Sequence, residues 1–533
     1  METCEVMTHN AQEAARTAAA GLPAPTPELV HFAPGDCALL IGPAETLLKR
    51  LEAVRLAGLR PALLCTDAPD LGSLPRGLRA LPGELAALSG WMGAFTARMA
   101  GPNGAVDLAP LSFHADGHFD WVLDFSGAPR TGVAPLGHYA LAADDFPGLK
   151  RALVEIAGRL RAGFDKPRYF QLEAGLCAHD RQGIPGCDAC LSACPADAIT
   201  GDKEGVRIEP HLCQGCGTCA LVCPSGAVRY AHPARGFSLA RLQAALAAWE
   251  DAGGGPAGVW IVRPERAAEA PAGWLTYALQ EPASLGLETW LAVLAAGAAR
   301  VAVAADGLPD ESRRALAQQI AIGRALLEGL GLAPALGLID DGDGLASLPA
   351  LPARQTVKLS GGDDKRALLF AAIDALAAQA GPRPGGREAA SPLPGGPMGA
   401  VRIHAEQCTL CAACVRICPS GALALAGSMS KLAFTEQRCL QCGLCAHVCP
   451  EKAVTLEPRL LYSAQARQTP RVVAEAEMFA CTGCGKPFAT RAMIERSRAM
   501  MASHPMFQGE QAKLMTLCPD CRQRAMAGCP PRP

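Results

Sequence analysis

The chain has 533 residues and a mass of 55.2 kDa, which exceeds what one hydrophobic core can hold and predicts about three to four domains. Its 49 basic and 51 acidic residues give a formal charge of −2, and only 5% of the residues are aromatic. The positive field and the stacking side chains typical of nucleic-acid-binding proteins are therefore absent, and we expect no nucleic-acid partner.

The N-terminal region is expected to form an α/β domain over residues 1–172. Short apolar runs predict strands, and longer runs with helical spacing of apolar residues predict helices. The predicted strands are 37–42, 61–66 and 119–125, and the predicted helices are 44–58 and 146–160. Strands that alternate with helices are typical of a mostly parallel, Rossmann-like sheet.

A second α/β domain is expected over residues 233–380, because the strand-like runs 259–264, 300–305 and 335–340 alternate with amphipathic segments. The segment 381–400 is rich in Pro and Gly and is typical of a linker. Two cysteine-rich regions alternate with these domains. They are the first cysteine module, 173–232, and the second cysteine module, 401–460, and a cysteine-containing tail follows at 470–530.

The 24 cysteines are the most informative feature of the composition. Residues 1–21 lack a basic segment followed by an apolar one, so no standard secretory signal is visible. No run of 18 apolar residues is present, and we expect no membrane span. We therefore expect a reducing, cytoplasmic location, in which clustered cysteines bind metals more often than they form disulfides.

The two cysteine modules are internal repeats of one motif. A Cys-Pro pair followed by a small-residue turn occurs four times, beginning at Cys194, Cys223, Cys418 and Cys449. Three of the four half-motifs fit C-x2-C-x2-C-x3-C-P without a gap: Cys213, Cys216, Cys219, Cys223; Cys408, Cys411, Cys414, Cys418; and Cys439, Cys442, Cys445, Cys449. Three closely spaced thiolates can surround one corner of a cubane cluster, while the fourth faces away from it. Zinc is the weaker alternative, because it needs only two CxxC pairs.

This spacing resembles the two-cluster bacterial-type ferredoxins, over about residues 177–230 and 402–458. The resemblance implies four [4Fe–4S] clusters, each with three ligands from one half-motif and the fourth from its partner. Set one would be Cys177, Cys187, Cys190 and Cys223, and set two Cys213, Cys216, Cys219 and Cys194. Set three would be Cys408, Cys411, Cys414 and Cys449, and set four Cys439, Cys442, Cys445 and Cys418. His447, inside the last half-motif, is expected to face solvent rather than to tune a cluster.

The first half-motif departs from the pattern, since Ile184 stands where its first cysteine should be. Cys177 lies upstream in a glycine-containing loop that could carry it back, and we prefer it as the missing ligand. The alternatives are a three-iron cluster, a ligand from His179 or Asp180, or Cys177 as a small buried hydrophobic residue.

The tail carries two CxxC pairs, Cys481 with Cys484 and Cys518 with Cys521, separated by 33 residues. The pairs resemble a Cys4 zinc ribbon, although the separation is longer than usual. They also look like the knuckles of rubredoxin, so a mononuclear iron, a further cluster or no metal stays open. Cys529 is expected to be free, and Cys37 and Cys65 to be core residues.

No dinucleotide-binding or phosphate-loop fingerprint appears in the sequence. The expected fold is thus α/β plus α+β: two Rossmann-like α/β domains alternating with two 2[4Fe–4S] ferredoxin modules, and a zinc-ribbon-like tail. We expect an electron carrier without a catalytic site. The alternatives are a subunit of a flavin-containing oxidoreductase and an assembly or maturation factor for a redox enzyme.

The overall plan resembles the bacterial polyferredoxin-type proteins that accompany molybdenum-dependent formate dehydrogenases. The segments that carry this resemblance are LCAHDRQGIPGC (176–187), HLCQGCGTCALVCP (211–224) and FACTGCGKPF (479–488). The resemblance implies redox proteins as partners, with a formate dehydrogenase among them.

Overall fold

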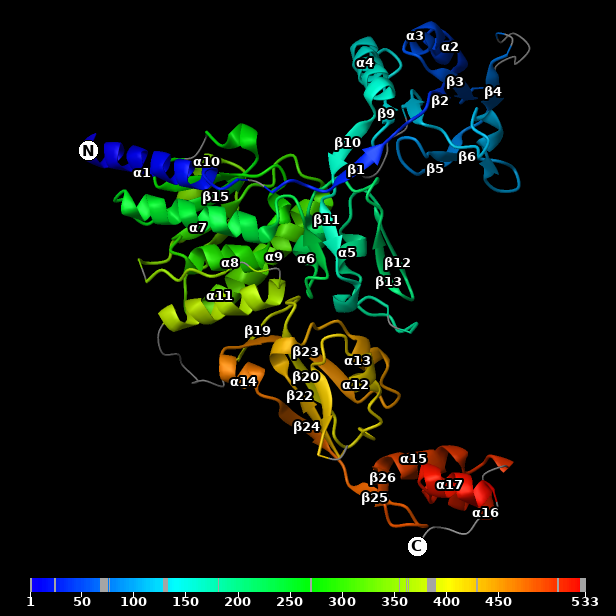
Figure 1. Cartoon of the computed structure of the whole chain (residues 1–533), viewed down its shortest axis with the longest axis vertical. Coiled ribbons are helices and arrows are strands. Elements are labelled where there is room, and N and C mark those ends of the chain that lie inside the picture. The colour runs from blue at the N-terminus through cyan, green and yellow to red at the C-terminus, as the bar shows by residue number, and fades with distance from the viewer. Residues whose placement is uncertain are drawn as a thin grey trace.

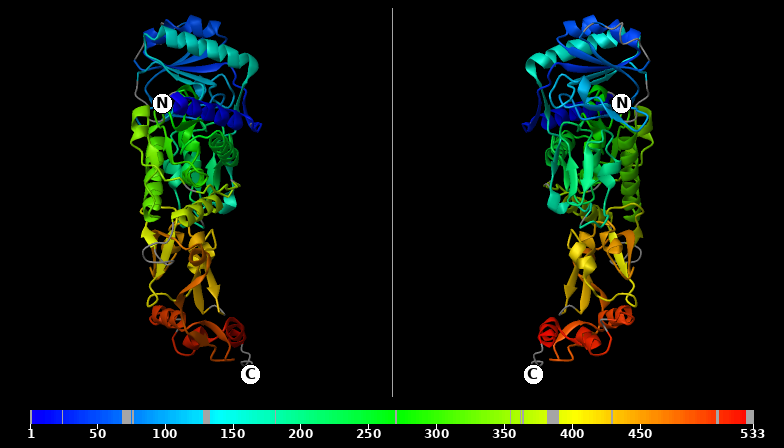
Figure 2. Two further views of the ribbon diagram at one scale, coloured as in Figure 1. Left: turned by 90° about the vertical axis from the view of Figure 1, so that its left-hand side faces the viewer. Right: turned by 90° about the vertical axis from the view of Figure 1, so that its right-hand side faces the viewer.

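The structure, a computed structural model, describes residues 2–23, 25–67, 75, 77–127, 133–180, 182–268, 271–353, 355–360, 362, 364–380, 390–427, 430–505 and 508–527. The N-terminal sheet lies at one end of the molecule and the C-terminal tail at the other (Figure 2), while the first cysteine module lies beside the second α/β region (Figure 1). Among these residues no helix is both long enough and apolar enough to cross a bilayer.

The first unit is built on a five-stranded parallel sheet in the order β4-β3-β2-β8-β9. Its strands are β2 (Cys37–Gly42), β3 (Arg60–Cys65), β4 (Arg79–Pro82), β8 (Trp121–Asp124) and β9 (His138–Ala140). Every residue of β2 is buried, because both faces of a central parallel strand are covered. The three strands predicted from the sequence are confirmed as β2, β3 and β8.

The two faces of this sheet are covered differently. Helices α2 (Ala44–Leu48), α3 (Leu51–Leu56) and α4 (Phe146–Ala162) pack on one face. The other face packs on the side chains of a small antiparallel sheet and its loops. The strands of that sheet are β5 (Leu85–Ser89), β6 (Thr96–Met99) and β7 (Val106–Asp107). The described part of this unit therefore lacks the helices on both faces that a Rossmann-like domain would have.

The second unit has a four-stranded parallel sheet in the order β16-β15-β17-β18. Its strands are β15 (Gly258–Val262), β16 (Trp274–Ala278), β17 (Arg300–Val303) and β18 (Leu336–Leu338). The predicted strands at 259–264, 300–305 and 335–340 are confirmed as β15, β17 and β18. The main core lies between this sheet and four helices, α7 (Arg235–Asp251), α8 (Leu287–Ala295), α9 (Asp310–Gly329) and α11 (Lys365–Ala380).

Helix α1 (Glu2–Ala20) packs on this second unit, although its residues fall in the segment predicted as the N-terminal domain. It lies along α7 (Figure 1), and Ala11 and Ala15 are buried in the core of the second unit. The Nε of Arg241 donates a hydrogen bond to the carbonyl oxygen of Ala19 at 2.7 Å. The chain then returns to the first unit through β1 (Leu29–Phe32), which pairs with β10 (Phe164–Pro167).

The two cysteine modules repeat one layout. In the first, β11 (Phe170–Leu172) pairs with β14 (Val228–Tyr230), and β12 (Ile199–Asp202) pairs with β13 (Gly205–Ile208). In the second, β20 (Gly399–Ile403) pairs with β23 (Val454–Leu461), and β21 (Leu423–Ala426) with β22 (Lys431–Phe434). Short helices follow the cysteines: α5 (Ala189–Ser192), α6 (Thr218–Val222), α12 (Ala413–Ile417) and α13 (Leu444–His447).

The predicted linker is partly a strand. Residues 390–392 form β19 (Ala390–Pro392), which pairs with β23, whereas 381–389 lie outside the described residues. On its other edge the second module is extended by β24 (Arg471–Glu475), which pairs with β22. The module is thus held at both edges by strands that lie outside the cysteine motif.

A buried ion cluster stabilises the second module. Glu436 is 2% exposed and lies 2.9 Å from Arg459 and 2.6 Å from Arg471. Burial alone would raise the pKa of Glu436, but the two guanidinium groups hold it below its ordinary value. We expect Glu436→Gln to lower the free energy of unfolding by about 1.5–2 kcal/mol, because charge-assisted hydrogen bonds are lost.

Urea unfolding followed by circular dichroism measures this effect. The exposed Glu406 of the same module gives the matched control, Glu406→Gln, which we expect to leave the midpoint unchanged. A Glu436→Gln midpoint equal to that of the wild type would show that the ion cluster is not stabilising.

Candidate functional site

Two of the four predicted ligand sets line small cavities. Set two lines one of them, and set three lines the other. Each cavity brings together three cysteines of one half-motif and the last cysteine of the other half-motif in the same module: Cys213, Cys216, Cys219 with Cys194, and Cys408, Cys411, Cys414 with Cys449. The cysteines of the two half-motifs therefore alternate, as the ferredoxin resemblance implies.

The other two sets are brought together in the same crosswise manner. Burial raises the pKa of the Cys190 thiol to about 12, and Cys223, Cys187 and Cys177 lie near enough to raise it further. In the second module, burial likewise raises the pKa of the Cys445 thiol. The neighbouring Cys439, Cys442 and Cys418 add to this shift.

The backbone of the complete motifs curls so that N–H groups point at the sulfurs. The second residue after the first cysteine donates its N–H to that cysteine, as Leu410 does to Cys408 and Gln441 to Cys439. These two residues have left-handed φ angles of 50° and 54°, and Ala412 has 62°. For a residue with a side chain, this conformation is unfavourable by roughly 1 kcal/mol or more. Such strain is characteristic of a backbone shaped for a bound group.

The turn after each Cys-Pro pair is a second repeated feature. The third residue after the last cysteine of every half-motif is left-handed: Asp197 (49°), Gly226 (74°), Gly421 (63°) and Lys452 (52°). This turn allows the N–H of the next residue to reach the cysteine sulfur, and Ala198 and Ala453 donate in this way at 3.3 Å. The internal repeat predicted from the sequence is confirmed down to single backbone angles.

The chemistry of the thiols fits iron–sulfur clusters. Burial raises the pKa of Cys187, Cys213 and Cys439 to about 11, so without metal these groups are neutral thiols at pH 7. A cationic metal centre displaces these protons when it binds, and the N–H donors then stabilise the thiolates. Convergent sulfurs, N–H donors and apolar walls together match what a [4Fe–4S] cluster requires.

Cys177 lies beside the rest of set one. It follows a short 3₁₀ turn (Ala174–Leu176) and packs with Cys190 and Cys223 in two small apolar clusters. The two alternative ligands are engaged elsewhere. The Nδ1 of His179 lies 2.9 Å from the carbonyl oxygen of Cys187, and Asp180 accepts a hydrogen bond from the backbone of Gly183.

We expect Cys177→Ser to remove about one to four iron atoms per chain and to leave the other three sets loaded. Iron analysis and low-temperature electron paramagnetic resonance of the reduced protein measure this effect. Cys37→Ser is the matched control, because Cys37 is a buried cysteine of β2 outside both modules. Unchanged iron and unchanged spectra in Cys177→Ser would remove Cys177 from the ligand set.

The two modules meet at set one and set four. Ile184 and Cys187 of the first module pack against Leu440, Leu444 and Cys442 of the second. The thiol of Cys187 is near enough to Cys442 for the second sulfur to raise its pKa. His447 is exposed, as expected, but its Nδ1 lies 2.6 Å from the carbonyl oxygen of Pro185, so it also joins the modules. The two inner sets therefore lie next to each other.

Helix α11 of the second unit begins at this contact. Lys365 donates to the carbonyl oxygens of Ala220 and Leu221 at 2.7 Å in the first module. Arg366 reaches both modules, because it donates to the carbonyl oxygens of Pro224 (3.3 Å) and Cys439 (2.9 Å). Burial lowers the pKa of Arg366 to about 10, so the guanidinium remains charged at pH 7.

The sequence offered no signal for Lys365 and Arg366. A basic pair near the start of a helix is common on protein surfaces, and its partners in the two cysteine modules lie more than 70 residues away along the chain. A cleft between the modules is lined by both residues and by Cys187, Cys223 and Cys442. The positive charge of Arg366 is thus held between the two inner ligand sets.

The four tail cysteines form a separate cluster. The sulfurs of Cys481, Cys484, Cys518 and Cys521 all lie within 4.8 Å of one another. The first pair lies on the hairpin of β25 (Met478–Ala480) and β26 (Pro487–Thr490), and the second pair at the start of α17 (Pro519–Met526). Burial opposes ionisation of Cys481, but backbone N–H groups of Cys518, Gly483 and Cys484 outweigh it and hold the pKa at about 6.

The tail contacts the second module at set three. Thr490 donates its hydroxyl to the carbonyl oxygen of Thr409 at 2.6 Å, and Thr409 lies between two cysteines of the set. Arg496, on α15 (Arg491–Met501), lies 3.3 Å from Glu451, which lines the cavity of set three. The tail therefore lies directly beside the outer end of the second module.

The remaining cysteines lie outside the ligand sets and the tail cluster. Cys37 and Cys65 are fully buried in β2 and β3, as expected. The side chain of Cys4 and all of Cys529 lie outside the described part of the chain. Sequence reasoning missed a group of His114, His118 and Asp120, whose spacing H-x3-H-x-D is the one signal that could have found it.

Comparison with known proteins assigns the two modules. Residues 185–227 and 407–453 each match the 4Fe-4S dicluster domain. The chain is 48% identical over 78 residues to indolepyruvate oxidoreductase subunit IorA of Pyrococcus horikoshii, which covers 14% of this chain and 11% of that protein. It is 44% identical over 39 residues to hydrogenase-4 component A of Escherichia coli, covering 7% and 19%. It is 38% identical over 40 residues to ferredoxin 7Fe of Hydrogenibacillus schlegelii, covering 8% and 51%.

These similarities are short: the chain spans about half or less of the length of each of these three relatives. They nevertheless show that the chain contains two ferredoxin-type 4Fe-4S dicluster domains, and these domains support an iron–sulfur electron-transfer role.

Proposed function

We propose that this chain is an electron relay that binds four [4Fe–4S] clusters in its four cysteine sets and carries electrons between redox proteins. The observation that carries the proposal is the contact between set one and set four. A cluster bound in such a set supplies one-electron transfer. Because electron tunnelling falls steeply with distance, only neighbouring sets can exchange electrons quickly.

We place the four sets in a row, in the order set two, set one, set four, set three. Sets two and one share the first module, and sets four and three share the second. Apolar side chains of Ile184, Leu440 and Leu444 pack at the contact between the modules. A cleft lined by Cys187 and Cys442 runs beside this contact.

The two ends of the row have different surroundings. At set two, Lys166 of the first unit donates to the carbonyl oxygen of Cys213, and Trp91 stacks on His211 at 4.9 Å. At set three, Cys411 is exposed, whereas the other described ligand cysteines are buried or half-buried. We therefore place the entry or exit for electrons beside Cys411.

The tail is proposed to bind one zinc ion through Cys481, Cys484, Cys518 and Cys521. The sulfurs of Cys484 and Cys518 are 3.8 Å apart. A tetrahedral ion with four Zn–S bonds of about 2.3 Å places its sulfurs about 3.8 Å from each other. A mononuclear iron would have the same geometry and is distinguished by its visible absorption.

We expect Cys481→Ser to remove about one zinc per chain and to leave the iron content unchanged, because the tail site is separate from the modules. Metal analysis of the purified protein measures both numbers. Loss of iron in place of zinc would identify the tail metal as iron.

The partners are proposed to be redox proteins, and the layout of the cysteine motifs makes a formate dehydrogenase the first candidate. The proposal includes a reducing, cytoplasmic location, in which clustered cysteines bind metals more often than they form disulfides.

Anaerobic purification followed by iron, sulfide, zinc and flavin analysis tests the cofactor content. Four sets predict about sixteen iron and about sixteen sulfide per chain, with about one zinc and no flavin. Iron near half that number would contradict the four-cluster proposal, and stoichiometric flavin would favour a subunit of a flavin-containing oxidoreductase.

A further inference from the structure

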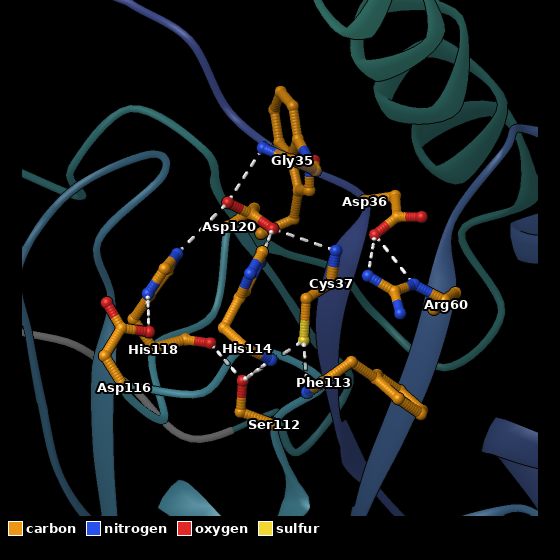
Figure 3. A network of polar contacts seen from close by, with 11 residues as sticks. Gly35, Asp36, Cys37, Arg60, Ser112, Phe113, His114, Asp116, His118 and Asp120 are labelled. Atoms are coloured by element: carbon orange, nitrogen blue, oxygen red, sulfur yellow. Dashed lines mark hydrogen bonds and ion pairs between the residues drawn. The ribbon is translucent and has the colours of Figure 1, made fainter.

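A cluster of two histidines and two aspartates lies in the first unit, outside both cysteine modules. His114, Asp116, His118 and Asp120 belong to one loop that leads into β8, and their side chains gather at one point (Figure 3). The potential ligand atoms of His114, His118 and Asp120 all lie within 4.8 Å of one another.

Asp120 is the buried anchor of the cluster. Its side chain is only 2% exposed, and its two oxygens accept hydrogen bonds from the backbone N–H groups of Gly35 (2.8 Å) and Cys37 (2.9 Å). The same oxygens face the imidazoles, with Oδ2 at 2.7 Å from the Nε2 of His114 and Oδ1 at 3.7 Å from the Nε2 of His118. The backbone therefore fixes this carboxylate in one orientation.

His118 is oriented as a metal ligand is. Its Nδ1 lies 2.5 Å from Asp116, so the carboxylate holds the ring proton on Nδ1 and leaves a lone pair on Nε2. That lone pair faces a carboxylate oxygen of Asp120 at 3.7 Å, which is too long for a hydrogen bond. Oδ1 also accepts the N–H of Gly35, and a carboxylate oxygen has a second lone pair with which it could share a cation with this nitrogen.

The separation suits an ion of the zinc class. Two ligand atoms that each lie about 2.1 Å from one ion, at an angle near tetrahedral, are about 3.4–3.7 Å apart. The rings of His114 and His118 are stacked, with centroids 4.0 Å apart, so both Nε2 atoms reach the same carboxylate. The Nε2 of His114 is hydrogen-bonded to Oδ2 of Asp120, so an ion bound by both nitrogens would replace this hydrogen bond and displace its proton.

Gly35 lets the backbone approach the cluster closely. A Cβ built on Gly35 would lie 2.8 Å from Oδ2 of Asp120 and 3.2 Å from the ring of His114. The imidazoles are 26% and 23% exposed, so one side of the cluster is open to solvent. Two histidines and one carboxylate with an open side are the donor set of metal sites that keep a free coordination position.

We propose that His114, His118 and Asp120 bind one divalent transition-metal ion of the zinc class, with Asp116 positioning His118. The site uses none of the cysteine sets, and it stands whether or not the chain is an electron relay.

Zinc binding to the full-length protein tests the proposal. Chelator-washed protein is dialysed against buffered zinc, and the bound metal is counted for the wild type and for the double variant His114→Ala, His118→Ala. We expect the wild type to bind about one zinc more than the double variant. The matched control is His31→Ala, which removes an exposed histidine paired with Asp165 alone and should bind as the wild type does.

A second variant and a spectroscopic measurement distinguish a metal site from a cluster held together by hydrogen bonds alone. Asp116→Asn should weaken zinc binding about tenfold, because it removes the group that orients His118. X-ray absorption at the zinc edge of the wild type should show imidazole nitrogens beside the sulfurs of the tail. Equal zinc content in the wild type and the double variant, or a spectrum with sulfur ligands alone, would overturn the proposal.

Discussion

Replacing Cys439 and Cys442 by alanine should stop the transfer of electrons from one module to the other. Both residues belong to set four, which lies against set one at the contact between the modules. We expect the double variant to lose about four iron atoms per chain. Without a cluster in set four, sets two and one would be too far from set three for rapid electron transfer.

The transfer is measured by flash reduction, followed by rapid freezing and electron paramagnetic resonance. In the wild type, electrons should reach the first module at a rate that does not depend on protein concentration. In the variant, that rate should become proportional to concentration, because only collisions between molecules remain. The matched control removes set two through Cys213→Ala and Cys216→Ala, which should leave transfer between the inner sets unchanged. A concentration-independent rate in the set-four variant would contradict the proposed order of the sets.

Arg366→Gln should lower the reduction potentials of the two inner sets. The guanidinium is held between them by the carbonyl oxygens of Pro224 and Cys439, and its charge favours the more negative, reduced state. For a charge that acts over about 8 Å at an effective dielectric constant of about 20, Coulomb's law gives about 2 kcal/mol. That energy corresponds to roughly 90 mV for a one-electron step.

A redox titration followed by electron paramagnetic resonance measures this shift. Arg366→Lys keeps the charge and should move the potentials less than Arg366→Gln does. Arg314→Gln removes an exposed arginine from the same cleft and is the matched control, with no shift expected because solvent screens its charge. Unchanged potentials in Arg366→Gln would show that this charge does not act on the inner sets.

The sequence was most informative where the relevant contacts are local. The spacing of the cysteines determines which sulfurs can face one centre, and the four repeated turns follow from that spacing, as at Asp197 and Lys452. The central strands could also be predicted from the sequence. A run such as 37–42 is apolar at nearly every position and must be covered on both faces. Cys177 stays a prediction, preferred because its glycine-containing loop could carry it back to the other three cysteines.

Other features depend on contacts between residues far apart in the chain. Helix α1 packs on α7, and Arg241 donates a hydrogen bond to Ala19. No local pattern in residues 2–20 predicts this contact. Strands β5 to β7 were missed because they are short and half-exposed, with little apolar alternation. The charge of Arg366 between the modules and the gathering of His114 with Asp120 likewise appear only once the chain is folded.

The central claim is that the two modules form one continuous relay through sets one and four. It is tested most directly in a variant that keeps only these inner sets, made by replacing Cys213, Cys216, Cys408 and Cys411 with alanine. About eight iron atoms per chain would show that the variant is loaded as intended. The relay predicts that the fully reduced variant gives a magnetically coupled electron paramagnetic resonance spectrum. Two sharp, independent signals would contradict it.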